Sequence, residues 1–429
     1  RSGGRPAPGE EMTSSTPLQD ARIGLSALIF RVYLPFALAY FLSYLYRTVN
    51  AVISVDLTED LALNAADLGL LTSAYYISFA AFQLPLGLLL DRYGPRRVHA
   101  TLLLVAALGA VLFALAQSLG MLFLARALIG VGVAAGLMAA LKAISIWFPA
   151  ERWALINGFH LAFGGLGAVF ATAPVEAALS VTDWRGVFIC LGGLTFAVSV
   201  FLMLAVPEKP ESHAKTSLGE ALGGVATVFR SAVFWRLAPA LILSQAAFMS
   251  IQTLWAGPWF RDVAGLDRNA SAQYLLAVAA AMSIGFMLSG VISGALARRG
   301  VTPYRTMCAG YVILMALHLP IIFDLMPSIL AAWALYGFFG AAGVLCFPIL
   351  THAFPLQLSG RVTTSANMLM FFSAFLLQYG MGEIIALWAR DAAGAYPAEA
   401  YSVAFAVALV LQVVTFAWLI LPRRPAAAG

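Results

Sequence analysis

Charged side chains are scarce in this chain of 429 residues. Asp, Glu, Lys and Arg together make up 10% of it, whereas hydrophobic residues make up 62%. Soluble domains carry about 25% charged and roughly 45–50% apolar residues. A soluble fold of this length could not bury so much apolar surface, so the composition excludes a water-soluble globular protein and indicates one that spans a membrane.

Cysteine is almost absent as well. Cys190, Cys308 and Cys346 each lie in an apolar segment without the paired spacing of a metal or redox site, so we expect packing roles for them. We recognise no cluster of His and Cys, no nucleotide-binding loop and no Ser-His-Asp arrangement in the sequence. The sequence therefore predicts a protein that is not an enzyme, uses no cofactor and holds no metal ion.

Long apolar runs recur along nearly the whole chain. A helix crosses the hydrocarbon core of a bilayer with about 20 mostly apolar residues. Twelve runs of this kind give the expected spans 30–54, 68–90, 98–117, 120–147, 153–178, 185–206, 234–258, 272–297, 303–323, 328–350, 362–388 and 399–421. The expected fold class is an all-α polytopic membrane protein made of two six-helix bundles.

The polar stretches set the expected divisions of the chain. These are a cytoplasmic tail at 1–28, an N-terminal bundle at 29–206, a cytoplasmic linker at 207–233, a C-terminal bundle at 234–421 and a cytoplasmic tail at 422–429. Because residues 1–28 are polar, we expect no cleavable signal peptide. The eleven residues before Met12 are rich in Gly, Pro and Arg and can be an added extension, so we expect no element of the fold in residues 1–28.

The distribution of basic residues supports the count of twelve. Short cytoplasmic loops are enriched in Lys and Arg. With both termini inside, eighteen of the 25 Lys and Arg residues fall on the inner side, four fall outside, and Arg47, Arg126 and Lys142 remain within spans. The net charge of +5 then reflects orientation in the membrane, and we predict no nucleic-acid partner.

A charged loop follows the second span and carries the pattern Gly-x-Leu-x-Asp-Arg-x-Gly-x-Arg-Arg over 87–97. It resembles the loop between helices 2 and 3 of the major facilitator superfamily of secondary transporters. The segment 294–300, between the eighth and ninth spans, keeps part of the same pattern. Two further segments resemble other parts of this family: Arg126-x-x-x-Gly-x-Gly resembles its helix 4 signature, and Trp-Phe-Pro-x-Glu-Arg at 147–152 resembles the loop after helix 4. The Gly-Pro pairing of the drug-antiporter signature is absent from the fifth span, which disfavours a multidrug exporter.

This resemblance implies two pseudo-symmetric bundles with both termini cytoplasmic, and a monomer in the lipid of a bacterial inner membrane. It also implies alternating access, with a substrate site near the midplane lined mainly by the first, fourth, seventh and tenth helices. Asp91 is expected to close the inner gate, and the basic residues are expected to hold the loop at the headgroups. The predicted gating residues are Gly87, Asp91, Arg92, Gly94, Arg96 and Arg97.

Arg47 in the first span is the leading candidate for substrate contact. A charged residue at a helix centre costs about 2.5–3.5 kcal/mol on insertion scales, so it needs a partner or a function. Its guanidinium is suited to carboxylate, phosphonate or sulfonate oxygens. Tyr44 and Tyr46 add hydroxyl groups, and Asn50 is three residues further on. The placement resembles the helix 1 arginine of organophosphate:phosphate antiporters and anion:cation symporters; the alternative is an arginine paired with a structural acid.

The seventh span has no second arginine, unlike that of the phosphate antiporters. A singly charged organic anion therefore fits better than a doubly charged phosphate. The predicted wall residues of this span are Gln245, Gln252, Trp255 and Trp259, although large aromatic residues in membrane helices also serve as packing or interface anchors. Lys142 is predicted as a second anion contact or a charge that changes partners during gating, with snorkelling to the inner interface as the alternative.

Proton coupling would offset the work of importing an anion against an inside-negative potential, about 2.3 kcal/mol per 100 mV. The predicted proton-coupling residues are Glu383, His160, Glu176 and Arg126. The alternatives are a packing histidine at 160 and a structural ion pair at 126. Three acids after the first span, Asp56, Glu59 and Asp60, are expected in a solvated outer loop.

The sequence thus predicts a secondary active transporter that moves a small organic anion (carboxylate, phosphonate or sulfonate) together with protons. The alternatives are a proton-coupled exporter of drugs or metabolites and a transporter-like ligand sensor. The cytoplasmic loops are short for a sensor, and no motif for ATP-driven transport is recognisable.

Overall fold

The computed structural model describes residues 24–208, 218–355 and 358–421. The helices of the first half are α1 (Leu25–Leu28), η1 (Ile29–Tyr33), α2 (Leu34–Thr48), α3 (Asn50–Leu61), α4 (Ala65–Ala114), α5 (Leu119–Val133), α6 (Gly136–Trp147), η2 (Ala150–Arg152), α7 (Trp153–Phe170), α8 (Ala173–Leu179) and α9 (Trp184–Ala205). Those of the second half are α10 (Leu218–Phe229), α11 (Ala232–Ser250), η3 (Ile251–Trp255), α12 (Ala256–Asp262), α13 (Arg268–Ala297), α14 (Pro303–Phe323), α15 (Ile329–Gly340), η4 (Ala341–Leu345), α16 (Cys346–His352), α17 (Ser359–Ile385) and α18 (Ala398–Ile420). The described residues contain no strand, which confirms the all-α class.

Eleven helices within the described residues are long and apolar enough to cross a membrane. One of them, α4, has 50 residues and is interrupted at Gly94, where φ is 75° and ψ is 162°. This left-handed conformation favours glycine, and Pro95 follows as the first residue of the next helical segment. Because α4 contains two membrane spans separated by this turn, the structure confirms the twelve predicted spans.

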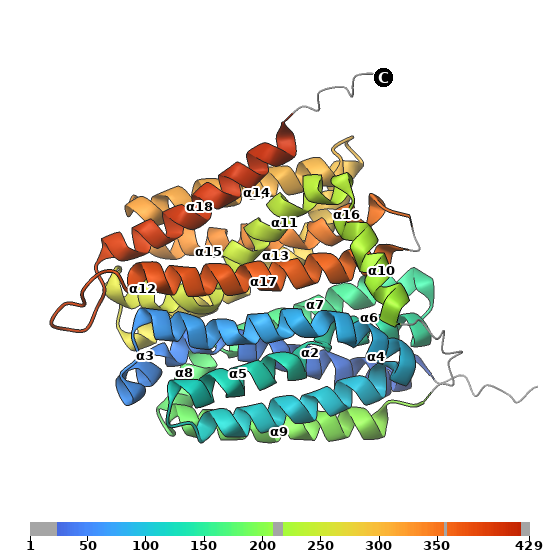
Figure 1. Cartoon of the computed structure of the whole chain (residues 1–429), viewed down its shortest axis with the longest axis horizontal. Coiled ribbons are helices and arrows are strands. Elements are labelled where there is room, and N and C mark those ends of the chain that lie inside the picture. The colour runs from blue at the N-terminus through green and yellow to red at the C-terminus, as the bar shows by residue number, and fades with distance from the viewer. Residues whose placement is uncertain (1–23, 209–217, 356–357, 422–429) are drawn as a thin grey trace, which may run out of the picture.

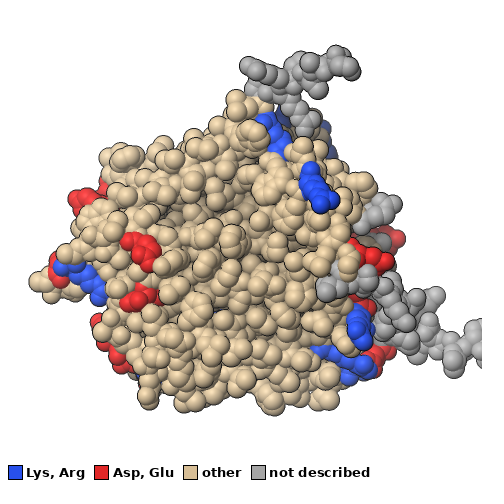
Figure 2. Space-filling model, viewed as in Figure 1, with Lys and Arg blue, Asp and Glu red and all other residues tan. Residues whose placement is uncertain are grey.

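The two halves lie along each other (Figure 1), with the first half in blue to green and the second in yellow to red. They meet where α4 packs against α17, where α7 packs against α13, and where α3 contacts η3 and α12. Charged side chains gather at the two ends of the molecule, and the visible face between them is almost free of charge (Figure 2). This uncharged belt is the surface expected to contact lipid.

Four membrane helices, the first, fourth, seventh and tenth, are irregular near their middles. The first breaks at Val49, between α2 and α3, and the fourth breaks between α5 and α6. The seventh contains the π-helix η3, and the tenth contains the 3₁₀ segment η4. Such irregular turns are frequent at functional sites and hinges. All four belong to the set that the family resemblance assigns to the substrate site.

The glycines of the fourth helix allow close contact between backbones. A Cβ atom added at Gly130 would overlap the carbonyl oxygen of Tyr75, and one added at Gly132 would overlap the backbone of Ala106. Small residues at such crossings are typical of membrane helix pairs. The Gly-x-Gly pattern therefore has a packing role, which holds the fourth helix against both spans of α4.

The ends of the chain and the linker differ in detail from the expectation. The first membrane helix begins at Leu25, inside the predicted tail of 1–28. The predicted linker contains the helix α10, which packs against α17 with Gly224 next to the side-chain carbons of Arg361. Residues 1–23, 209–217 and 422–429, on which the rest of the tails and linker fall, lie outside the described residues.

Candidate functional site

A cavity of about 760 Å³ lies between the two halves. Its lining residues are Tyr40, Ser43, Tyr44, Arg47, Phe79, Val133, Ala134, Leu137, Met138, Leu141, Trp153, Asn157, Leu161, Gln245, Phe248, Met249, Gln252, Thr253, Met282, Phe286, Gly343, Phe347, Pro348, Thr351, His352, Thr363, Asn367, Met370 and Phe371. The first, fourth, seventh and tenth membrane helices supply most of them, and the second, fifth, eighth and eleventh supply the rest. Among the described residues, Arg47 is the single Arg or Lys in this lining, and no Asp or Glu belongs to it.

The cavity extends to one end of the molecule. Trp153 is the first residue of α7, His352 is the last residue of α16, and Thr363 lies in the first turns of α17. These ends lie on the side of the Gly94 turn, which the basic residues assign to the cytoplasm. The cavity therefore reaches the end of the molecule that carries the Gly94 turn, and with the orientation expected from the basic residues this is an inward-facing arrangement.

Arg47 lies in the last turn of α2, just before the break at Val49, and its side chain is 7% exposed. Aromatic rings surround it: its Cζ atom is 4.4 Å from the ring centre of Tyr44 and 5.0 Å from that of Phe371. Its Nε atom is buried without a hydrogen-bond partner, and none of the ion pairs found in the described part of the chain includes it. The alternative of an arginine paired with a structural acid thus has no support here.

The other candidates from the first span point in different directions. Tyr44 lines the cavity next to Arg47. Tyr46 is fully buried on another side of α2, where its hydroxyl group is 2.8 Å from Oγ1 of Thr195. Asn50 lies beyond the break and donates a hydrogen bond to Oγ1 of Thr72 at 2.8 Å. Tyr46 and Asn50 are therefore not in the cavity lining.

The four candidates from the seventh span divide in the same way. Gln245 and Gln252 line the cavity, and Oε1 of Gln245 is buried without a partner. Trp255 donates a hydrogen bond to the backbone oxygen of Gln378 at 3.2 Å and lines a separate pocket at the outer end. Trp259 packs against Trp333, with the ring centres 5.2 Å apart, and lines neither space.

Polar contacts across the halves close the cavity on its outer side. The hydroxyl group of Tyr76 in the first half is 2.6 Å from Oγ1 of Thr253 in the second. Thr253 in turn is 3.3 Å from Oε1 of Gln378. Beyond this layer, Arg390 donates a hydrogen bond to the backbone oxygen of Leu63 at 2.7 Å.

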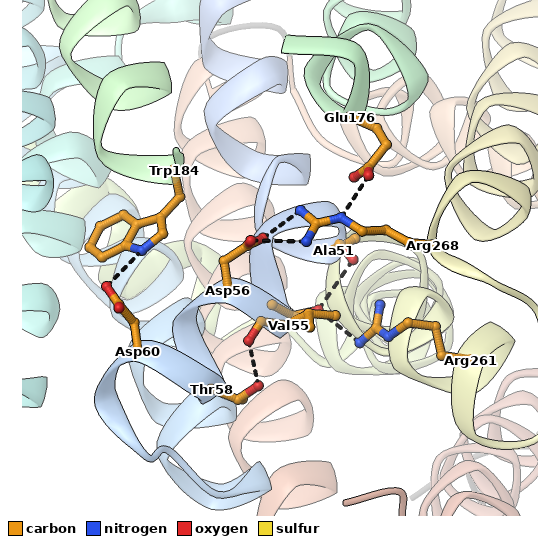
Figure 3. Close-up of polar contacts among 10 residues, drawn as sticks. Ala51, Val55, Asp56, Thr58, Asp60, Glu176, Trp184, Arg261 and Arg268 are labelled. Atoms are coloured by element: carbon orange, nitrogen blue, oxygen red, sulfur yellow. Dashed lines mark hydrogen bonds and ion pairs between the residues drawn. The ribbon is translucent and has the colours of Figure 1, made fainter. Parts of the chain in front are cut away.

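An ion-pair cluster of Asp56, Glu176 and Arg268 also joins the halves at this end (Figure 3). Arg268, at the start of α13, donates from Nη1 and Nη2 to the two oxygens of Asp56 on α3 at 2.9 and 2.7 Å. Its Nε atom donates to Oε1 of Glu176 on α8 at 2.6 Å. Glu176, predicted as a proton carrier, thus contributes to the outer closure in this state.

The expectation of an outer loop at Asp56, Glu59 and Asp60 is wrong. The first membrane helix continues as α3 to Leu61, because Val52, Ile53 and Leu57 remain buried along its inner face. Asp60 is within 3.1 Å of Arg185. Ala62, with φ of 52°, then ends the helix in a left-handed turn.

Lys142 and the charged loop contact each other at the inner end. Nζ of Lys142 is 3.0 Å from Oδ1 of Asp91 and 2.8 Å from the backbone oxygen of Leu90. Arg96 donates from Nε and Nη2 to the backbone oxygen of Met203 at 3.0 and 2.6 Å, and Arg97 pairs with Glu208 at 2.5 Å. Gly87 has open space around it, and Arg92 lies over the ring of Tyr93. The structure does not bring Lys142 to the cavity lining beside Arg47.

Replacing Asp91 with Asn is expected to slow transport several-fold while leaving expression near normal. The neutral amide loses the ion pair with Lys142 and cannot act as an anion when the inner gate closes. Initial uptake rates at equal amounts of reconstituted protein measure the effect, with the exposed inner acid Glu151→Gln as the control. Uptake kinetics equal to those of the unmodified protein would reject a gating role for Asp91.

The remaining proton-coupling candidates are not among the residues that line the cavity. Arg126 is 1% exposed and donates from Nη1 to the backbone oxygen of Tyr46 at 2.7 Å, while its Nε and Nη2 atoms have no partner. His160 is fully buried, with its ring stacked on Tyr40 and Nε2 at 3.3 Å from the backbone oxygen of Gly136. Glu383 is exposed on α17.

Sequence reasoning missed several lining residues. Phe79 and Phe371 stack on each other at 3.9 Å and border Arg47. Asn157, which was missed as well, has a buried amide oxygen without a hydrogen-bond partner. Polar amides inside predicted spans were the available signal, but the sequence alone does not show which of them share one cavity.

Known proteins resemble the chain over most of its length. A family model described as Major Facilitator Superfamily matches residues 36–378. The chain is 23% identical over 350 residues to a probable sulfoacetate transporter of Cupriavidus necator, which covers 78% of this chain and 81% of that protein. It is 32% identical over 155 residues to a hexuronate transporter of Escherichia coli, which covers 36% of each.

Solved structures show the same fold. A bacterial homologue of the human lysosomal transporter Spinster, in an inward-facing and occupied conformation, superposes with a TM-score of 0.72 at 19% identity, covering 91% of this chain and 96% of that one. The fucose:proton symporter of E. coli gives a TM-score of 0.58 at 19% identity, covering 90% and 99%.

Proposed function

Because the chain belongs to the major facilitator superfamily, we propose that it is a secondary transporter that moves a small organic anion across a bacterial inner membrane by alternating access. The observation that carries this proposal is Arg47, a buried guanidinium in the lining of the central cavity without an acid partner among the described residues. A buried unpaired charge is strongly unfavourable unless a ligand compensates it. An anionic substrate group provides that compensation.

The rest of the lining supports an organic anion with one charged group. Arg47 is the single Arg or Lys among the described lining residues, and much of the rest of the lining is apolar, with side chains such as Leu137, Met138 and Phe347. Gln245 and Asn157 present buried amide oxygens that can accept hydrogen bonds from hydroxyl groups. The names of similar proteins agree with an organic anion, since they refer to sulfoacetate, L-galactonate and hexuronate, although sulfoacetate carries two acidic groups and the other two carry one.

A thermal-shift panel on the purified protein tests the proposal. The panel contains galactonate, glucuronate, sulfoacetate, a phosphonate, nitrate and a cationic drug. At least one organic anion is expected to raise the midpoint of unfolding by several degrees, since a ligand at 100 times its Kd stabilises by about 2.7 kcal/mol. The shift is expected to disappear in Arg47→Ala and to persist in Arg305→Ala, which removes an exposed charge on α14.

Two outcomes would contradict the proposal. A shift by an organic anion that survives Arg47→Ala would place the anion site elsewhere. Stabilisation by the cationic drug alone would favour the exporter alternative. Comparing sulfoacetate, which carries two acidic groups, with the monoanions tests whether one arginine limits the substrate to a single charge.

Coupling to protons stays a prediction. None of its candidate carriers (Glu383, His160, Glu176 and Arg126) lines the inward-facing cavity. Proton symport through these residues would need a second conformational state in which at least one of them lines the path of the substrate. A monomeric state and contacts with lipid likewise stay predictions from the family resemblance.

A further inference from the structure

The charges inside the first half are not balanced. Arg47 and Arg126 are both at least nine-tenths buried, and neither takes part in an ion pair among the described residues. Arg126 donates to a backbone oxygen and lies over the rings of Phe113 and Phe188, and the partners found for Arg47 in the described part of the chain are aromatic faces. Arg47 nevertheless lines the open cavity and keeps 7% of its surface exposed, which leaves a part of the residue accessible to water.

This hydration is lost when the cavity closes. Alternating access requires the inner ends of the helices to come together, which brings apolar lining residues such as Leu141 and Phe347 towards each other. Water then leaves, and the guanidinium is left in a low-dielectric space. Aromatic faces offset part of the lost hydration, but not the full charge. A bound anion neutralises the charge directly, so the loaded carrier closes at a lower free-energy cost than the empty one.

The titratable groups near Arg47 do not offer a substitute anion. Tyr40, Tyr44 and His352 are the other titratable residues in the lining, and His352 is exposed at the inner mouth. The neighbouring α4 contributes Tyr75 and Tyr76, and α17 contributes the ring of Phe371. None of these is a carboxylate that could pair with Arg47 in the empty carrier and be protonated when substrate binds.

We propose, on the basis of the proposed anion transport, that this protein works as an anion exchanger. One substrate anion leaves as another enters, and the empty carrier reorients slowly because Arg47 has no internal counter-charge. Exchange of like anions moves no net charge across the membrane and requires no proton. This mode of transport is distinct from the proton symport that the sequence predicts.

Proteoliposomes test the proposal with radiolabelled galactonate, glucuronate and sulfoacetate. The labelled anion is added to vesicles that are either empty or preloaded with the same unlabelled anion. Uptake is expected to be at least roughly tenfold faster into preloaded vesicles and insensitive to an imposed membrane potential or pH gradient, because only the loaded carrier reorients readily.

The outcomes separate the two proposals. Accumulation of an anion in empty vesicles, driven by an acidic exterior, would overturn exchange and leave anion transport standing. Failure of all three anions to enter either kind of vesicle would overturn the proposed function and exchange with it. Uptake that is faster into preloaded than into empty vesicles, without accumulation driven by an acidic exterior, supports both anion transport and exchange.

A designed counter-charge gives a second test. Phe371→Glu places a carboxylate next to Arg47, whose Cζ atom lies 5.0 Å from the ring that is replaced. This variant is expected to lower the ratio of uptake into preloaded and empty vesicles several-fold, and to make uptake depend on pH. Phe371→Gln loses the same stacking on Phe79 without adding a charge and is the matched control. If the ratio of uptake into preloaded vesicles to uptake into empty vesicles were equal in the Glu and Gln variants, the role of the missing counter-charge would be overturned. The same ratio in the unmodified protein tests exchange even if neither variant folds.

Discussion

Replacing Arg47 with Ala is expected to lower anion uptake by at least about 100-fold. Charge-assisted hydrogen bonds contribute about 1.5–3 kcal/mol each, and every 1.4 kcal/mol changes affinity tenfold. A guanidinium that binds a carboxylate through two nitrogens therefore accounts for this loss. Arg47→Lys keeps the charge but loses the planar fork and its stacking on Tyr44, so an intermediate loss of roughly tenfold is expected.

The measurement is the initial rate of counterflow in proteoliposomes over a range of anion concentrations. Tyr46→Phe is the matched control: it changes the neighbouring residue but removes only a hydroxyl group that contacts Thr195 outside the cavity. That variant is expected to stay within about twofold of the unmodified protein, since a typical net hydrogen bond is worth only about 1 kcal/mol and acts here on stability. Uptake by Arg47→Ala at near-normal rates would remove Arg47 from the substrate path.

The sequence predicted the helices well because the bilayer imposes one simple requirement. Each span needs a long apolar run, and the turns between spans are marked by charge, Gly or Pro. The turn at Gly94 and the start of the helix at Pro303 follow directly from such signals. The helix α10 was missed since it lies on the polar linker, where hydropathy carries no information about membrane spans.

The sequence identified Arg47, which lines the cavity, but it wrongly placed the nearby residues Tyr46 and Asn50 in the same lining. Residues three apart share a face only in a continuous α-helix. In the first membrane helix, Val49 keeps α-helical torsions (φ −54°, ψ −29°), but Arg47 is the last residue of this helix in the cavity lining, and Asn50, further along the helix, donates to Oγ1 of Thr72 instead. In the seventh helix, the π-turns of η3 separate Gln252, which lines the cavity, from Trp255, which lines the outer pocket.

Partners of the charged residues depend on helices that are distant in the sequence. Lys142 and Asp91 are 51 residues apart, and Asp56 and Arg268 are 212 residues apart. No periodicity within one span predicts such pairs. The sequence could therefore state that these charges need partners, but the packing of the two halves decides which partner each one meets.

Arg268→Gln is expected to shift the protein towards an outward-open state. The substitution removes the hydrogen bonds that join α13 of the second half to Asp56 and Glu176 of the first. The Arg268 side chain is 38% exposed, so screening by solvent reduces the contribution of the cluster. A loss of about 1.4 kcal/mol would raise the outward-open population roughly tenfold.

Labelling from the outer side measures this population. Gln252→Cys places a thiol in the cavity, behind the outer layer formed by Tyr76 and Thr253, in a background without the three native cysteines. A membrane-impermeant thiol reagent outside right-side-out vesicles is expected to react roughly tenfold faster when Arg268→Gln is also present, because the label reaches the cavity only when the outer side opens.

Arg185→Gln is the matched control for this shift. Arg185 also lies at the outer end and pairs with Asp60 at 3.1 Å, but α9 and α3 both belong to the first half. Breaking an ion pair within one half leaves the contact between the halves unchanged, so the labelling rate is expected to stay near that of the unmodified protein. Equal rates in Arg268→Gln and Arg185→Gln would show that the ion-pair cluster does not hold the outer side closed, and the layer of Tyr76, Thr253 and Gln378 would then account for the closure.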